Sequence, residues 1–166
     1  MSPHLPPMGV VIQHEDVANP GARQLLAAFD QDVWDRNAGV MFDEIDPPAY
    51  RTVGGAFFVG YADGTWVSCG AYRSTPEGDA RFERLFVSPS TRRMGLWRCM
   101  LEHLQVKARL DGYDRAVLQT GLRHVEAILL FRSSGWSVIP NFGQHCHEPL
   151  CVCFGKELGS SAGRSH

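Results

Sequence analysis

The spacing of apolar residues changes several times along the chain, and each change predicts a new helix, strand or loop. Residues 10–16 (VVIQHED) begin with an apolar run that indicates a short strand. Residues 21–34 then carry apolar side chains at helical spacing, which predicts a helix with one buried face. These side chains are Leu25, Leu26, Phe29 and Val33. Residues 46–50 (DPPAY) are predicted to form a loop.

The middle of the chain has the pattern of three consecutive strands. Two apolar runs within residues 56–73 meet at Ala62-Asp63-Gly64, where the Asp-Gly pair is typical of a hairpin turn. Residues 80–88 (ARFERLFVS) then predict a third strand, whose side chains alternate between two faces. One face is expected to carry Phe82, Arg84 and Phe86, and the other Arg81, Glu83, Leu85 and Val87.

The second half alternates between helix and strand. Residues 95–110 predict a helix that ends at Asp111-Gly112, with an apolar stripe of Trp97, Met100, Leu101, Leu104 and Ala108. Residues 124–134 predict another helix, which ends at Gly135 so that Trp136 folds back on it. Its apolar face is expected to hold Val125, Ile128 and Leu129.

Strands over residues 115–120, 137–140 and 150–158 complete the pattern. The order of elements predicts an α/β (α+β) fold. We expect a central mixed, mostly antiparallel sheet flanked by helices on both faces.

Length, composition and charge restrict the class of protein. With 166 residues, 44% of them hydrophobic, we expect one domain over residues 9–158, between a flexible arm (1–8) and a flexible tail (159–166). A net charge of -2 argues against a nucleic-acid-binding protein. No apolar stretch approaches the ~20 residues that cross a bilayer, and the N-terminus lacks the pattern of a signal peptide. We therefore expect a cytoplasmic protein without membrane contact.

The cysteines and histidines near the C-terminus raise the question of a metal site. His145, Cys146, His147, Cys151 and Cys153 lie close together in the sequence. Buried free cysteines are common core residues, and the five cysteines of the chain form no regular framework. We therefore predict free thiols and no metal site.

Residues 88–100 (SPSTRRMGLWRCM) suggest a binding site. Two arginines and Gly95 lie in a turn between a predicted strand and a predicted helix. The first amides of a helix have no internal partners and carry the positive end of its dipole, and a glycine lets a ligand approach them. A pyrophosphate fits this arrangement, although a solvated basic loop has the same composition.

In its setting, this segment resembles the acetyl-CoA signature of the GNAT superfamily of N-acetyltransferases. Residues 92–97 (RRMGLW) fall on the family pattern Arg/Gln-x-x-Gly-x-Gly/Ala. Residues 84–93 (RLFVSPSTRR) are similar to the strand and loop of that family, and residues 127–136 (AILLFRSSGW) to its second cofactor-contacting helix. The resemblance extends from about Val10 to Leu158.

The resemblance implies an enzyme that transfers an acetyl group from acetyl-CoA to a primary amine of a small molecule or peptide. The pyrophosphate would lie against Arg92, Arg93, Met94, Gly95, Leu96 and Trp97. The pantetheine would lie beside Leu85, Phe86 and Val87, in a slot where this strand parts from the strand over residues 115–120. His124 is expected as a helix cap or a cofactor contact.

Three positions depart from the family pattern. Trp97 stands where the family has Gly or Ala, so its indole either packs as core under the loop or narrows the cofactor site. The glutamate that often serves as base in the family aligns with Arg81. The tyrosine that often serves as acid corresponds to Phe131, which has no proton to donate.

Two residues are candidates for the base. Glu83 lies on the same face of the strand as Arg81, although an ion pair with Arg81 or Arg92 explains it equally well. His145 is the second candidate, because an ordinary histidine has a pKa of ~6.5.

The departures leave other functions open. One alternative is a non-catalytic GNAT-like module that binds CoA weakly or not at all and acts as a sensor or partner subunit. Another is a regulatory domain that binds a different phosphate ligand. Tyr72 is a candidate contact for the acceptor, and pairing through an exposed sheet edge would form a homodimer.

Overall fold

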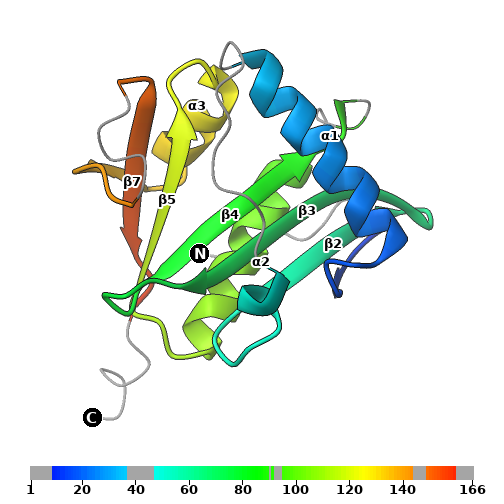
Figure 1. Ribbon diagram of the computed structural model, residues 1–166, viewed down its shortest axis with the longest axis horizontal. Helices are drawn as coiled ribbons and strands as arrows, with labels where there is room; N and C mark the ends of the chain where they lie inside the picture. The colour runs from blue at the N-terminus through cyan, green and yellow to red at the C-terminus, as the bar shows by residue number, and fades with distance from the viewer. Residues whose placement is uncertain (1–8, 37–46, 90, 92–94, 144–148, 160–166) are drawn as a thin grey trace.

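The computed structural model describes residues 9–36, 47–89, 91, 95–143 and 149–159. They form a seven-stranded sheet with strand order β1-β2-β3-β4-β5-β7-β6 (Figure 1). The strands are β1 (Val10–His14), β2 (Ala56–Ala62), β3 (Thr65–Ser74), β4 (Ala80–Val87), β5 (Arg115–Gly121), β6 (Ser137–Ile139) and β7 (Cys151–Glu157). The helices are α1 (Pro20–Arg36), α2 (Leu96–Leu110) and α3 (Val125–Ser133), with a short 3-10 helix η1 (Pro47–Tyr50). The predicted arm and all but the first residue of the predicted tail lie outside the described residues.

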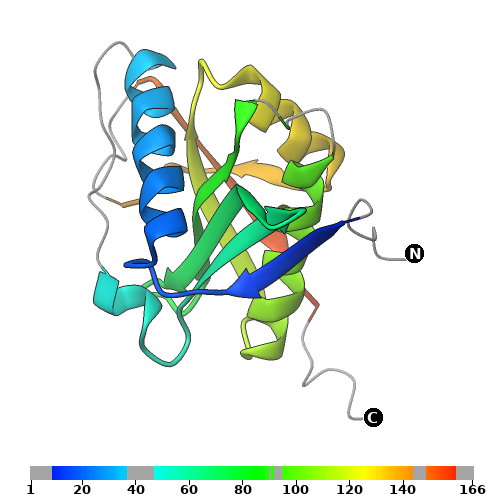
Figure 2. The ribbon, with the colours of Figure 1, turned by 90° about the vertical axis from the view of Figure 1, so that its right-hand side faces the viewer.

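The sheet is mixed and mostly antiparallel, as predicted. Each pair of neighbouring strands is antiparallel except β4 and β5, which are parallel. Figure 2 shows α1 on one face of the sheet and α2 and α3 on the other. In the part of the chain that the structure describes, no helix has both the length and the apolarity of a membrane span.

Each face of the sheet has its own apolar core. Side chains under α2 and α3 form the larger cluster, which includes Phe82, Met100, Leu104, Phe131 and Phe154. Side chains under α1 form a second cluster, which includes Leu25, Phe57, Val59 and Phe86. The apolar face predicted for α1 is therefore confirmed.

Local signals in the sequence set the ends of several elements. Asp63 and Gly64 both have positive φ (50° and 80°), as expected for the tight turn between β2 and β3. α2 ends at Leu110 with Asp111 as its C-cap, and Gly112 follows with φ 98°. After α3, the backbone N–H of Trp136 donates to the carbonyl of Phe131 at 3.0 Å, so the predicted fold-back is confirmed.

The buried face of α3 differs from the prediction. Of the three residues predicted to face the core, Ile128 is partly buried and packs against it. Val125 and Leu129 are 58% and 61% exposed, whereas Ala127, Leu130 and Phe131 are buried. All of residues 125–131 except Glu126 are apolar, so the sequence offers more than one apolar stripe. Phe131 packs against the rings of Trp136 and Phe154, two residues outside the helix. These contacts decide which apolar stripe of α3 is buried.

Candidate active site

A β-bulge interrupts β4 in the middle. Ala71 of β3 pairs with Glu83, but Cys69, two residues away, pairs with Phe86, three residues away on β4. One residue of β3 therefore opposes two residues of β4, and Arg84 takes the extra place with φ 57°. The strict alternation predicted for this strand is wrong, because the bulge shifts every later side chain by one place.

The bulge decides which side chains of β4 lie on each face of the sheet. Phe82 and Leu85, three residues apart, both contact the core under α2 and α3. Phe86 packs in the core under α1. The carbonyl of Arg84 accepts a hydrogen bond from the buried thiol of Cys69 at 3.2 Å, which helps to hold the bulge.

Beyond its first half, β4 separates from β5. The parallel pairing covers only Ala80, Arg81 and Phe82 on β4, matched with Ala116, Val117 and Leu118 on β5. Figure 1 shows the two strands diverging from this point towards their carboxyl ends. The V-shaped slot that the resemblance implied is therefore present, and the bulge lies along its β4 side.

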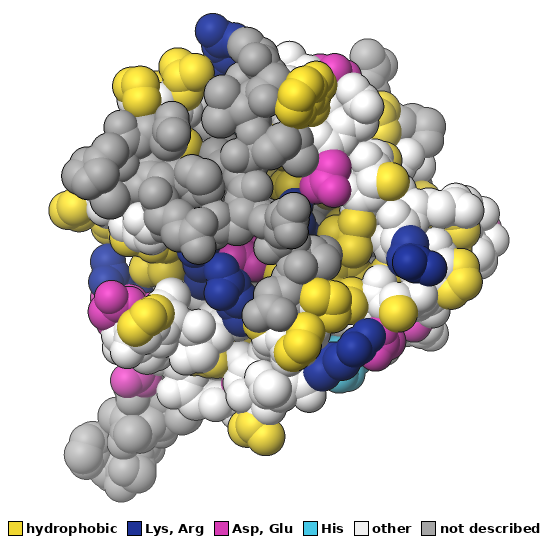
Figure 3. Space-filling view, viewed as in Figure 1, with side chains coloured by type: hydrophobic (Ala, Val, Ile, Leu, Met, Phe, Trp, Pro, Cys, Tyr) yellow, Lys and Arg dark blue, Asp and Glu magenta, His cyan; other side chains and the backbone are white. Residues whose placement is uncertain are grey.

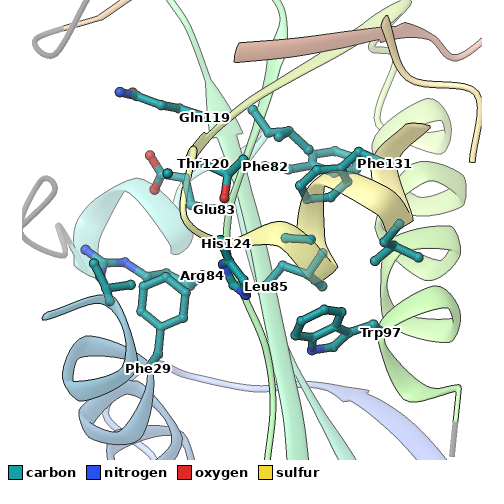
Figure 4. A pocket seen from close by; sticks show the side chains of 15 residues that line it. Phe29, Phe82, Glu83, Arg84, Leu85, Trp97, Gln119, Thr120, His124 and Phe131 are labelled. Carbon is teal, nitrogen blue, oxygen red and sulfur yellow. The ribbon is translucent and has the colours of Figure 1, made fainter. Parts of the chain in front are cut away.

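A pocket occupies the slot (Figure 4). Five elements contribute to it, because the gap between the strands connects both faces of the sheet. Its wall comprises Phe29 and Val33 of α1, Phe82, Glu83, Arg84 and Leu85 of β4, Trp97 of α2, Leu118, Gln119, Thr120 and Gly121 of β5, and His124, Ala127, Leu130 and Phe131 at α3.

Aromatic rings form the wall next to α2 and α3. The indole of Trp97 meets the imidazole of His124 edge to face, with 5.5 Å between ring centres. Trp97 is partly buried and also packs against two apolar clusters. Phe131 is buried, and it contacts Phe154 with 5.6 Å between ring centres. This side of the pocket is suited to an extended, largely apolar group.

The carboxylate of Glu83 lies on the other side of the pocket, where it accepts two hydrogen bonds and forms an ion pair with Arg81. The Nε of Arg73 donates to its Oε1 at 2.9 Å, and the Nε of Arg81 lies 3.1 Å from the same oxygen. The hydroxyl of Tyr50 donates to Oε2. Burial, followed by the charge of Glu83, raises the pKa of Tyr50, so this hydroxyl keeps its proton and remains a donor.

Arg84 connects the bulge to α1. Its Nη1 donates to Oδ1 of Asp30 at 2.9 Å, and its guanidinium lies 5.3 Å from the ring centre of Phe29. The cation–π contact and the ion pair together fix the helix that covers this end of the pocket.

The structure brings together several residues that the sequence singled out. Glu83, Leu85, Trp97, His124 and Phe131 all line the pocket. Gly95 precedes α2 with φ 70°, and His124 stands at the N-cap of α3 without a side-chain capping bond. Arg92, Arg93, Met94 and His145 lie outside the described residues.

Other predicted site residues belong to the core. Leu96 and Val87 pack together in a small cluster, and Phe86 lies under α1. Tyr72 needs a correction, because it is only 2% exposed and its hydroxyl donates to Asp111. It packs among Phe58 and Phe82 and presents no surface to an acceptor.

Four polar residues at this site had no local signal in the sequence. Tyr50 lies 33 positions from Glu83 in a segment predicted as loop, and η1 brings it there. Arg73, Asp30 and Gln119 are ordinary polar residues within their elements. Only the alternation of side chains along β3 and β5, combined with the strand order, would have suggested Arg73 and Gln119.

Comparison with known proteins agrees with this geometry. Residues 20–136 match the model of the acetyltransferase (GNAT) family. An IAA acetyltransferase from Azospirillum brasilense is 33% identical over 103 residues, which cover 61% of this chain and 67% of the relative.

Solved structures share the fold. A protein assigned as an acyl-CoA N-acyltransferase from Klebsiella pneumoniae subsp. pneumoniae superposes with a TM-score of 0.75 at 24% identity, over 90% of this chain and 97% of the other. A GNAT family acetyltransferase from Elizabethkingia anophelis, solved with acetyl-CoA bound, gives a TM-score of 0.67 at 13% identity, over 90% and 99%. The extent of the family match and the divergent β4–β5 pair lead to one conclusion: this chain belongs to the GNAT family of acetyltransferases and is an acyltransferase.

Proposed function

We propose that this enzyme transfers an acetyl group from acetyl-CoA to a primary amine of a small molecule or peptide. The observation that carries the proposal is the pocket between β4 and β5, which reaches both faces of the sheet. Such a pocket lets a thioester approach from the α3 side and an amine from the α1 side. The names of the relatives support acetyl as the acyl group.

The residues present fit acetyl-CoA as cosubstrate. Leu85 lines the pocket, and a pantetheine chain would lie along the backbone of Leu85, Phe86 and Val87 like an additional strand. Gly95 stands at the start of α2, and within the described residues no atom lies within 4 Å of where a Cβ would be, so a phosphate has room to approach. Arg92 and Arg93 would add positive charge beside it. Bound acetyl-CoA supplies an acyl group already activated as a thioester.

Glu83 is the residue we assign as base. An amine must lose a proton to attack a thioester, and Glu83 lies at the pocket wall on the α1 side. Its carboxylate is held by Arg73, Arg81 and Tyr50, so it is fixed in position, and it must exchange one of these donors for the proton. His145 remains the second candidate.

The departing thiolate receives no proton from Phe131. An ordinary thiol has a pKa of about 8.5, so a thiolate is a tolerable leaving group without a dedicated acid. Solvent that enters from the pocket mouth would complete the protonation. We therefore expect turnover that is slower than with a tyrosine at this position.

Two measurements test the proposed function. Titration calorimetry with acetyl-CoA should show binding, and release of free CoA thiol should follow when a panel of primary amines is added. Binding without turnover on any amine would favour the non-catalytic module. Absence of acetyl-CoA binding at millimolar ligand, with binding of a nucleotide instead, would contradict the proposal.

A further inference from the structure

Gln119 presents a buried hydrogen-bond donor at the pocket. The Nη2 of Arg81 lies 3.5 Å from Oε1 of Gln119. A guanidinium can only donate, so the amide oxygen must face Arg81 and the amide nitrogen must point elsewhere. This nitrogen is buried, and no described residue accepts a hydrogen bond from it. Buried amide donors normally have a partner, so an ordered water or an atom of a ligand in the pocket must supply the acceptor.

The Gln119 amide lies on the side of the pocket where the acceptor amine of the proposed reaction would bind. Ala116 and Leu118 belong to the core under α2 and α3, so alternation along β5 places Gln119 on the α1 face. Figure 4 shows the polar ends of Gln119 and Glu83 directed to the same side, away from Trp97 and Phe131. The side chains expected to contact acetyl-CoA are therefore on the opposite face from the Gln119 amide.

Glu83 and Gln119 lie close to each other across the slot. Phe82 and Leu118 form the last matched pair of β4 and β5, so Glu83 and Gln119 are the next positions on each strand. Arg81 links the two, because its Nε lies 3.1 Å from Glu83 and its Nη2 contacts Gln119. One guanidinium thus sets the spacing between the proposed base and the amide donor.

We infer that Gln119 binds a carbonyl or carboxylate oxygen of the acceptor, which stands a few bonds from the reacting amine. The inference rests on the proposed acetyl transfer and names the class of its acceptor. Amino acids, amino-acid amides and peptide N-termini have an oxygen at this spacing, whereas simple alkylamines do not. A site with a buried donor rejects an acceptor that lacks the matching oxygen, because the donor then stays unpaired.

The test compares the wild-type enzyme with Gln119→Met, which keeps the length of the side chain and removes the donor. Gln31→Met is the matched control, because Gln31 lies on the exposed side of α1 and bonds only to Asp35 there. The substrates are matched pairs: several amino-acid amides, and the same amines without the carbonyl group. Thiol release gives kcat/KM, calorimetry gives acetyl-CoA affinity, and thermal unfolding gives Tm.

The wild-type enzyme should prefer the amides at least tenfold in kcat/KM. Gln119→Met should lower kcat/KM for the amides about tenfold and leave the carbonyl-free amines within twofold, so that the preference disappears. Acetyl-CoA affinity should be unchanged. Tm should change by only a few degrees, since the variant removes an unpaired buried donor and also the oxygen that faces Arg81. Gln31→Met should behave as wild type.

Other outcomes would overturn the inference. These are a wild-type preference for carbonyl-free amines, an equal loss on both members of each pair, or a loss of acetyl-CoA affinity in Gln119→Met. Failure of the proposed function itself looks different, since the wild type would then not bind acetyl-CoA or would acetylate neither the amides nor the carbonyl-free amines.

Discussion

The chemical role of Glu83 depends on the residues that surround its carboxylate. Its side chain is only 13% exposed, and guanidinium and hydroxyl donors reach both of its oxygens. The ion pair considered from the sequence is therefore present, with Arg81 and also with Arg73. Such a network orients a carboxylate at the pocket wall, and an ion pair and a catalytic role are compatible in the same residue.

Glu83→Gln should separate the two roles. The amide keeps an oxygen for the arginine donors but cannot take a proton from an amine, so we expect kcat/KM to fall about 100-fold. The measurement is kcat/KM between about pH 6 and pH 9, together with Tm to verify folding. Glu157→Gln, at the exposed end of β7, is the control. Activity within threefold of wild type would show that Glu83 is structural only and would direct attention to His145.

Trp97 is the second residue whose role depends on its neighbours. The indole packs against apolar clusters and His124, and it also forms part of the pocket wall. The packing that the first alternative predicted is therefore present, and a Trp97 variant tests the second. Its contacts with the core make the packing role the larger one.

Trp97→Ala should lower the free energy of unfolding by about 2 kcal/mol, because it removes a partly buried aromatic ring. Acetyl-CoA affinity should change less than threefold, since in the proposed complex backbone amides at the start of α2 would supply most of the phosphate contacts. Denaturant unfolding and calorimetry measure the two effects. Trp34→Ala, at a half-exposed position of α1, should cost less stability. A large gain in affinity would mean instead that the indole obstructs the cofactor.

At the scale of elements, the bulge of β4 and helix α1 form one unit. The bulge places Arg84 where its guanidinium reaches both Asp30 and the ring of Phe29. Phe29 and Val33 of the same helix line the pocket. The position of α1 over the acceptor side therefore depends on an ion pair that begins at the bulge.

Asp30→Asn should weaken the contact between Arg84 at the bulge and helix α1. We expect a loss of about 1 kcal/mol in stability and a several-fold rise in the KM of the acceptor, with little change in acetyl-CoA affinity. Steady-state kinetics and denaturant unfolding provide the test. Asp35→Asn, on the exposed end of α1, should leave both quantities unchanged. An equal effect of the two variants would show that overall charge of the helix, and not the contact with Arg84, is responsible.

At the scale of the whole molecule, His103 makes stability depend on pH. Its ring meets Phe58 edge to face at 4.7 Å, and no described residue bonds to its Nε2. Burial, and then the charge of Lys107, lower its pKa to about 4 from the ordinary value of 6.5. Between these two values the unfolded chain binds a proton that the folded protein does not.

The free energy of unfolding should therefore be highest above about pH 6.5 and should fall as the pH is lowered towards 4. We expect about 1 kcal/mol to be lost to His103 between about pH 7 and pH 5, after allowance for partial exposure of the ring. Urea unfolding at several pH values measures this. His103→Leu should flatten the profile over that range, and an unchanged slope would contradict the assignment to His103.

The surface of the molecule also carries apolar side chains that no described residue covers. Figure 3 shows several of them on the face that includes the ends of β5 and α3. Val125 and Leu129 are among the exposed apolar residues of that helix. They result from the rotation of α3 that buries Phe131. This rotation could not be predicted from a helix with six apolar residues among its nine.

The sequence by itself determined the order of elements, their ends and the family. These features depend on short-range signals: the Asp63-Gly64 turn, Gly95 before α2, Gly112 and Gly135 after the helices, and the period of apolar residues. Only the tertiary structure decided the bulge at Arg84, the buried face of α3, and the network of Tyr50, Arg73 and Arg81 around Glu83. Each of these depends on contacts between segments far apart in the chain, where packing and hydrogen bonding between elements override the local pattern. For the same reason, the donor of Gln119 became a sign of the acceptor only once β4 and β5 were placed side by side.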